Sequence, residues 1–243
     1  SFICFSGCLH GVLESAIAKD ESYLNNLDKL CKLTDSKRDF NNFQCLHGTG
    51  HGLMDYFGLD VLKSVKQCDT LPTEWDQESC YGGVFMENIV FSMRSGETPK
   101  FLNPSDPLFP CNSDIIEEKY KRQCFWIQTS YVLFVNRFDY ADTAEKCRQL
   151  EYPYIEYCFH SLGRDISGYN FYDLNKQIEL CELTEEFIVT CYTAVVKNIV
   201  STTSIVDRGF EFCKLLKEEY KANCYRTVGY DVTLIYPTKE ERQ

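Results

Sequence analysis

The sequence lacks a long hydrophobic run and is poor in positive charge. No stretch of about 18 consecutive apolar residues occurs, so we predict no transmembrane segment in this chain. Nothing at Ser1 resembles an intact signal peptide, and any targeting segment is expected to have been removed or to lie outside this sequence. The chain has 25 Lys and Arg against 36 Asp and Glu, a net charge of −11. That sign disfavours nucleic acid and anionic lipid as partners.

Several local motifs are also missing. No Cys-x-x-Cys pair occurs, which argues against a zinc ribbon or a thioredoxin-type redox site. No acceptor for N-glycosylation is present, because Asn103 is followed by Pro104. The absence of a Gly-x-Ser-x-Gly sequence gives no support to a serine nucleophile.

Cysteine, by contrast, is abundant, with 14 residues in a chain of 243. A chain of this length buries a large core without covalent help, and its 44% hydrophobic content is that of a folded protein. An even number of cysteines indicates disulfides and an oxidising compartment. We therefore predict an extracellular, cell-surface or periplasmic location.

Half of the cysteines recur at nearly constant spacing. They are Cys8, Cys45, Cys80, Cys124, Cys158, Cys191 and Cys224. The intervals between them are 37, 35, 44, 34, 33 and 33 residues. A period of this size is typical of a helix-turn-helix solenoid, in which each unit must stack on its neighbour to bury its apolar face. We predict an all-α, right-handed α/α superhelix of six to seven hairpins of ~34 residues.

Six of the seven remaining cysteines precede one of these by 10 to 14 residues and suggest one disulfide per hairpin. The predicted pairs are Cys31 with Cys45, Cys68 with Cys80, Cys111 with Cys124, Cys147 with Cys158, Cys181 with Cys191, and Cys213 with Cys224. Cys4 and Cys8 are left over. They could form a local bridge, Cys8 could have lost a partner upstream of Ser1, or one could be a reactive thiol.

The helical hairpins can be placed along the chain. Predicted pairs are 23–33 with 40–56, 59–71 with 73–93, 141–150 with 154–169, 174–183 with 185–200, and 206–216 with 218–236. Thr184 is the predicted N-cap of the helix at 185. We expect one domain over 1–243, with a first repeat (1–20) that keeps only its second helix. Residues 95–110, rich in proline, form an insertion that shortens the next helix, and the tail 238–243 is expected to fray.

This pattern resembles the tetratricopeptide and Sel1-like class of α/α repeat proteins, in particular cysteine-rich members with a disulfide in each hairpin. The resemblance rests on period, helix pairing and small residues at the helix crossing, and neither consensus is present. It implies a superhelix whose second helices line a concave face that binds a peptide or protein. The stretch Tyr81-Gly-Gly-Val-Phe-Met-Glu-Asn88 and the His-Gly motifs also resemble an uncharacterised group of secreted proteins, which implies no activity.

Two positions of the repeat contain several glycines: the third is mostly small, whereas the fifth mixes glycine with bulky residues. The third residue after each recurring cysteine includes Gly11, Gly48 and Gly83, and the fifth includes Gly50, Gly163 and Gly229. Glycine inside a helix costs about 1 kcal/mol relative to alanine. We therefore predict close approach of neighbouring helices at these positions.

The second and sixth positions after the cysteines lie on one helix face and contain all four histidines. Neighbouring second helices lie ~10 Å apart in such a stack, so His10 and Glu14 are expected to meet His47 and His51. These four are the predicted ligands of a divalent metal, zinc first, with copper and iron as alternatives. The other interpretation is that the histidines donate hydrogen bonds across a polar groove and bind nothing.

Five further residues of the second helices are candidates for ligand binding. They are Glu87, Asn88, Trp126, His160 and Arg164. The alternative for His160 and Arg164 is that they form a cluster of ion pairs and hydrogen bonds with Asp165 between repeats and bind no ligand.

Three functions fit the sequence. We expect a binding or assembly module with a protein or peptide partner or with itself. The alternatives are a metal-dependent hydrolase with Glu87 as general base, and a structural subunit of an extracellular filament or layer.

Overall fold

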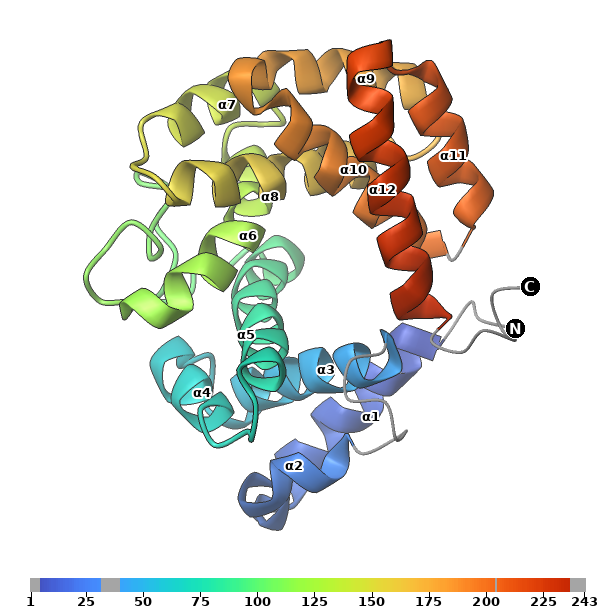
Figure 1. The fold of residues 1–243 in the computed structure, drawn as a ribbon. Coiled ribbons are helices and arrows are strands. Elements are labelled where there is room, and N and C mark those ends of the chain that lie inside the picture. The colour runs from blue at the N-terminus through green and yellow to red at the C-terminus, as the bar shows by residue number, and fades with distance from the viewer. Residues whose placement is uncertain (1–4, 32–39, 204, 237–243) are drawn as a thin grey trace. The chain divides into compact units, whose positions relative to one another are not determined.

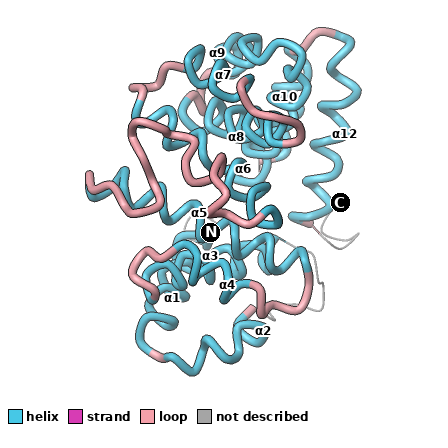
Figure 2. Tube along the Cα trace, turned by 90° about the vertical axis from the view of Figure 1, so that its left-hand side faces the viewer, coloured by secondary structure: helices cyan, strands magenta, loops and turns pink. Residues whose placement is uncertain are grey.

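The computed structural model describes residues 5–31, 40–203 and 205–236. Within these ranges the chain forms helices, turns and loops and no strand, as Figures 1 and 2 show. The predicted all-α class is therefore confirmed. No helix in the described ranges is both long enough and apolar enough to span a membrane.

Except between residues 96 and 117, where no helix occurs, short first helices alternate with longer second helices as predicted. The longer helices are α1 (Phe5–Lys19), α3 (Phe40–Tyr56), α5 (Glu74–Ser95), α6 (Glu118–Val135), α8 (Tyr154–Tyr169), α10 (Ile188–Thr203) and α12 (Glu218–Ile235). The shorter helices are η2 (Glu21–Asn26), α2 (Leu27–Leu30), α4 (Val61–Cys68), α7 (Tyr140–Arg148), α9 (Leu174–Cys181), η3 (Glu182–Phe187) and α11 (Val206–Leu215).

Aspartates set the starts of three of the short helices. The side chains of Asp60, Asp139 and Asp173 each accept the backbone N–H of the residue three positions further on, at the first turn of α4, α7 and α9. Thr73 does the same for α5. Each cap accepts a hydrogen bond from a backbone N–H group that has no acceptor within the helix. This stabilises the helix by about 1 kcal/mol.

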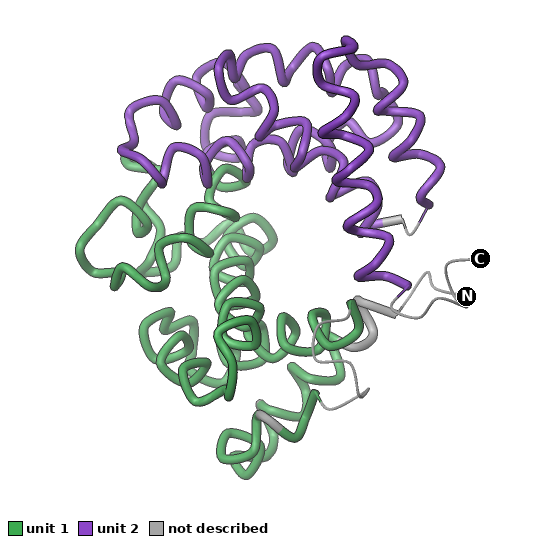
Figure 3. The backbone as a smooth tube through the Cα atoms, in the orientation of Figure 1, with its two compact units in different colours: residues 1–131 green, residues 132–243 purple. Residues whose placement is uncertain are grey.

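The chain divides into two compact units, Ser1–Tyr131 and Val132–Gln243, with the boundary inside α6 (Figure 3). In the first unit α1 packs on α3, α3 packs on α5, and α4 packs on both α3 and α5. In the second unit α8 packs on α10 and α10 on α12, while α7 lies on α8 and α11 on α12. Within each unit, therefore, the second helices of successive hairpins lie side by side.

All six predicted disulfides are present. They join Cys31 to Cys45, Cys68 to Cys80, Cys111 to Cys124, Cys147 to Cys158, Cys181 to Cys191, and Cys213 to Cys224. Their Cα–Cα distances run from 5.5 to 5.8 Å, and the closed loops are short. A bridge over a loop of this length contributes about 3 kcal/mol, mainly by restricting the unfolded chain. Cys4 lies outside the described residues, as does the side chain of Cys8.

Glycines let the second helices approach closely, as predicted. A Cβ built on Gly83 of α5 would lie 1.9 Å from the carbonyl oxygen of His47, and one on Gly50 of α3 would lie 2.2 Å from that of Cys80. Gly163 of α8 meets Cys191 of α10 in the same way, at 2.5 Å. No side chain fits into these contacts, so the helix backbones touch at those points.

Three local expectations were wrong. The repeat that contains the insertion has no first helix at all, since residues 96–117 form turns. This stretch is held down because Asn88 donates a hydrogen bond to the Phe101 carbonyl (3.0 Å) and Gln128 donates to that of Pro107 (2.8 Å). Thr184 does not cap a helix: its hydroxyl donates to the Cys181 carbonyl, and α10 begins only at Ile188. The helix predicted over 23–33 is split into η2 and α2 in its described part, and residues 32 and 33 lie outside the described residues. The tail 238–243 lies outside the described residues.

Candidate metal centre

The side-by-side packing of α1, α3 and α5 forms a polar cluster in the first unit. Glycines of α3 set the approach of α1. A Cβ on Gly48 would lie 2.8 Å from the His10 ring, and one on Gly52 would lie 3.3 Å from the Cα of Glu14. The residues predicted to meet therefore do so because small residues face them on the next helix.

Three histidine rings contact one another in this cluster. The ring centroids of His10 and His51 are 5.1 Å apart, those of His47 and His51 5.1 Å, and those of His10 and His47 5.6 Å. His47 and His51 are buried and His10 is half-buried. The sequence-based expectation that α1 and α3 bring these side chains together agrees with this geometry.

Glu14, His51 and Glu87 each offer one ligand atom, and these three atoms lie within 4.8 Å of one another. His51 Nδ1 is 2.7 Å from Glu87 Oε2, and the other oxygen of Glu87 accepts a hydrogen bond from Arg94 Nη2 at 3.0 Å. Glu87 is only 8% exposed. A buried carboxylate needs partners, since its desolvation is costly, and here it has a histidine and an arginine.

The other two predicted metal ligands have different partners. His10 Nε2 lies 3.2 Å from Gln44 Oε1, and His47 Nε2 lies 3.4 Å from Met86 Sδ. Burial lowers the pKa of His10, and nearby His51 lowers it further. A lowered pKa keeps the imidazole neutral near pH 7, which is the form that binds a metal.

One atom of the cluster stands out. His51 Nε2 is buried and has no hydrogen-bond partner among the described residues. A buried polar atom left without a partner costs about 1–3 kcal/mol. In a cluster that also holds two carboxylates, such an atom is where a cation or an ordered water would be expected.

The remaining predicted ligand-binding residues lie in other surroundings. Asn88 is buried and fastens α5 to the insertion through its bond to Phe101. The guanidinium of Arg122 covers the ring of Trp126, 4.5 Å from its centroid. His160 lies half-buried on α8, in the second unit. On the same helix Arg164 Nη2 is 2.6 Å from Asp165 Oδ1.

Sequence reasoning named Glu87 but missed its partner Arg94 and the packing role of Gly82. Arg94 lies seven residues after Glu87 on α5, which is two helical turns. The sequence therefore placed both side chains on the same face of the helix and could have predicted this ion pair. A Cβ on Gly82 would lie 3.3 Å from His47 Nδ1 and 3.7 Å from Gln123 Oε1. Gly82 therefore makes room for the His47 ring.

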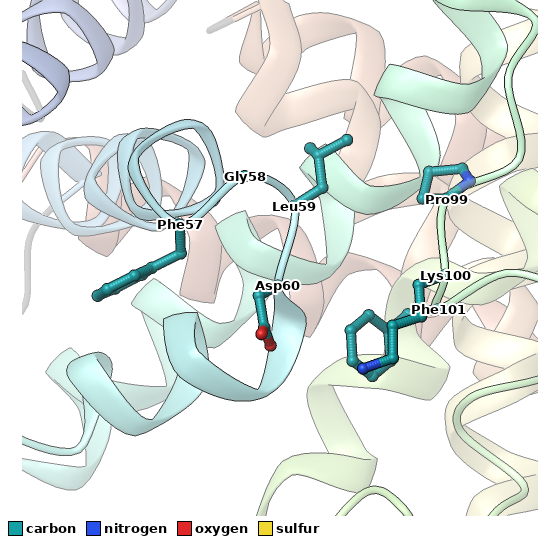
Figure 4. A pocket seen from close by; sticks show the side chains of 7 residues that line it. All are labelled: Phe57, Gly58, Leu59, Asp60, Pro99, Lys100 and Phe101. Carbon is teal, nitrogen blue, oxygen red and sulfur yellow. The ribbon is translucent and has the colours of Figure 1, made fainter.

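A separate hollow of about 250 Å³ opens on the first unit where the turn after α3 faces the insertion (Figure 4). Its lining residues are Phe57, Gly58, Leu59, Asp60, Pro99, Lys100 and Phe101. The Lys100 ammonium lies over the Phe101 ring at 4.9 Å. None of the clustered histidines or carboxylates lines this hollow, so it is distinct from the polar cluster.

No protein-family model, no curated protein and no solved structure matches this chain. The functional argument therefore depends on the site itself.

Proposed function

We propose that this protein is a helical-repeat binding module that holds one divalent metal ion, zinc in the first place, in the cluster of Glu14, His51 and Glu87. The observation that carries the proposal is His51 Nε2, a buried nitrogen without a hydrogen-bond partner among the described residues, on a ring that shares its cluster with the carboxylates of Glu14 and Glu87. Imidazole with carboxylate is a ligand set of zinc, whereas magnesium and calcium favour oxygen alone. Copper and iron also accept these ligands.

The proposed architecture is a right-handed superhelix of the tetratricopeptide and Sel1-like kind. It is supported by the period of the cysteines and by the row of second helices in each unit. The six disulfides support an extracellular, cell-surface or periplasmic location, because reducing compartments rarely preserve such bonds. In this proposal the metal stabilises one end of the array, and the array binds a protein or peptide.

The experiment is a zinc titration of the oxidised, metal-free protein, with bound zinc counted by elemental analysis. We expect one zinc per chain. The His51→Ala change should weaken binding by more than about 100-fold, since loss of an outer partner alone costs about 10–100-fold. His160→Ala is the control, because it removes a histidine from the corresponding helix face in the other unit and should leave zinc binding unchanged. Absence of zinc uptake by the wild type would refute the proposal.

The hydrolase alternative requires Glu87 to accept a proton from water. Both of its carboxylate oxygens are already hydrogen-bonded, one by His51 and the other by Arg94, and this disfavours a role as general base.

A second candidate function is end-to-end assembly into an extracellular filament or layer, and the two terminal glycines support it. Gly83 faces the preceding second helix and Gly50 the following one. Gly11 of α1 and Gly229 of α12 occupy the equivalent positions at the two ends of the repeat series. A Cβ on either would meet no atom of the described residues within 4 Å. Each end therefore presents a helix contact that has no occupant in the described chain.

Sedimentation velocity over a range of concentrations tests assembly. We expect concentration-dependent association that Gly229→Trp abolishes and that Lys214→Trp, an exposed change on α11, leaves intact. A monomer at all concentrations, or equal behaviour of the two variants, would rule this candidate out.

A further inference from the structure

Glu87 and its two partners, Arg94 and His51, form a chain of three charged or polar groups. Arg94 Nη2 lies 3.0 Å from Glu87 Oε1, and Glu87 Oε2 lies 2.7 Å from His51 Nδ1. Arg94 and Glu87 share α5, and His51 comes from α3. The guanidinium is largely exposed, while the carboxylate and the imidazole are buried. The chain thus runs from the surface to the inside of the cluster.

This arrangement fixes which nitrogen of His51 carries the proton. A carboxylate oxygen is only an acceptor, so Nδ1 must be the donor in the contact with Glu87. In the neutral imidazole the lone pair then lies on Nε2. Nε2 is the buried atom that has no hydrogen-bond partner among the described residues. A buried lone pair held in one direction is a prepared metal ligand.

We propose that Arg94 and Glu87 are positioning residues that orient His51 so that its Nε2 binds the metal, and that Glu87 itself is not a ligand. This inference rests on the proposed function and specifies how the site works. Metal-binding histidines commonly donate their other ring N–H to a carboxylate, which orients the ring and makes the ligand nitrogen more basic. Arg94 holds the carboxylate of Glu87 in place by donating a hydrogen bond to its other oxygen.

The alternative geometry makes Glu87 a direct ligand together with Glu14. In that geometry one oxygen of Glu87 would have to bind the cation in addition to its present contact, either with the His51 ring (2.7 Å) or with the Arg94 guanidinium (3.0 Å). The proposed geometry breaks neither contact. The first ligands are then His51 Nε2 and Glu14, and the neighbouring ring of His10, 5.1 Å from that of His51, is the next available donor after rotation.

The first test needs no metal. Nitrogen NMR of the metal-free, oxidised protein at a pH where His51 is neutral reports the tautomer of its ring. The proposal expects the proton on Nδ1 in the wild type, with a loss of that preference in Glu87→Gln, whose amide can offer either an acceptor or a donor. A wild-type ring protonated on Nε2 would overturn the inference.

The second test separates a positioning residue from a ligand by using cobalt as a spectroscopic probe and zinc for affinity. We expect Glu87→Gln to lower zinc affinity by about 10–100-fold, as for outer-shell carboxylates, and to leave the cobalt absorption spectrum in place. Arg94→Met should act in the same direction with a smaller effect. Glu14→Gln should both weaken binding and change the spectrum.

A spectrum that changes equally in Glu87→Gln and Glu14→Gln would make Glu87 a ligand and overturn the inference, with the proposed function intact. No metal uptake by the wild type would overturn the proposed function instead, while the tautomer measurement would still stand. Far-ultraviolet circular dichroism of each metal-free variant shows that it is folded.

Discussion

Replacement of Asp231 by asparagine should stabilise the protein at neutral pH. Asp231 lies on α12, is only 6% exposed, and its Oδ2 has no hydrogen-bond partner among the described residues. Burial raises the pKa of this carboxyl group from 3.8 to about 6, although Lys197 acts in the opposite direction. The folded protein therefore binds this proton more tightly than the unfolded chain does.

The sign and size of the effect follow from that shift. An acid whose pKa is higher in the folded state stabilises the fold below its ordinary pKa, and this contribution is lost as the pH rises through about 6. A difference of about two pKa units corresponds to about 3 kcal/mol. The free energy of unfolding should thus fall by up to about 3 kcal/mol between pH 4 and pH 7.5 on account of this one residue.

An asparagine side chain cannot ionise, so the Asp231→Asn protein should lack this part of the pH dependence. We expect it to be more stable than the wild type at pH 7.5 by up to about 3 kcal/mol and nearly equal to it at pH 4. Urea denaturation of the oxidised proteins at several pH values measures the difference. Carbon NMR of the Asp231 carboxyl group should show a titration midpoint near 6.

Asp207→Asn, a change at an exposed aspartate of α11, is the control and should not alter the pH dependence. The reasoning is refuted if the Asp231 carboxyl titrates near pH 4, or if the stability difference between Asp231→Asn and the wild type is the same at pH 4 and pH 7.5.

Two further predictions concern the first unit. Gly83→Ala should lower the free energy of unfolding by about 2–4 kcal/mol, because its Cβ would lie 1.9 Å from the His47 carbonyl oxygen and would force α3 and α5 apart. In the control Gly229→Ala the new Cβ meets no described atom within 4 Å, so this change should be neutral or stabilise by up to about 1 kcal/mol. Thermal unfolding of both variants measures the difference. Burial acts to raise the pKa of Asp69, but hydrogen bonds from Lys119, Tyr81 and Tyr120 outweigh it and hold that pKa below its ordinary value. Asp69 therefore stabilises the fold above pH 4, and this stabilisation is lost as the pH falls through the lowered pKa. The Asp69→Asn protein should be less stable than the wild type by about 1–3 kcal/mol at pH 7 and by a smaller amount at pH 2. An equal loss of stability at both pH values would contradict this account.

The helices and the disulfides were predictable because both depend on short stretches of chain. A cysteine on each helix of a hairpin, 10 to 14 residues apart, can hardly pair elsewhere once the repeat is recognised. The errors arose where local signals conflicted. Thr184 looks like an N-cap, yet Glu185 takes a positive φ of 49° and the Thr184 hydroxyl bonds backwards to Cys181, so the helix starts later. In the repeat with the proline-rich insertion we predicted a shortened first helix, but residues 96–117 contain no helix.

The candidate site was predictable as a set of residues but not as a set of atoms. Periodicity of the cysteines was enough to place His10, Glu14, His47 and His51 on one face of adjacent helices, since a helix repeats its direction every three to four residues. Whether two ring nitrogens converge depends on how far one helix slides along the next and on side-chain rotation. Those were settled by the contact of Gly50 with Gly83, which brings Glu87 to His51 Nδ1 and leaves Nε2 unpaired among the described residues. Helix periodicity acts within a segment, whereas this alignment comes from close packing between segments distant in sequence, and only the folded structure contains it.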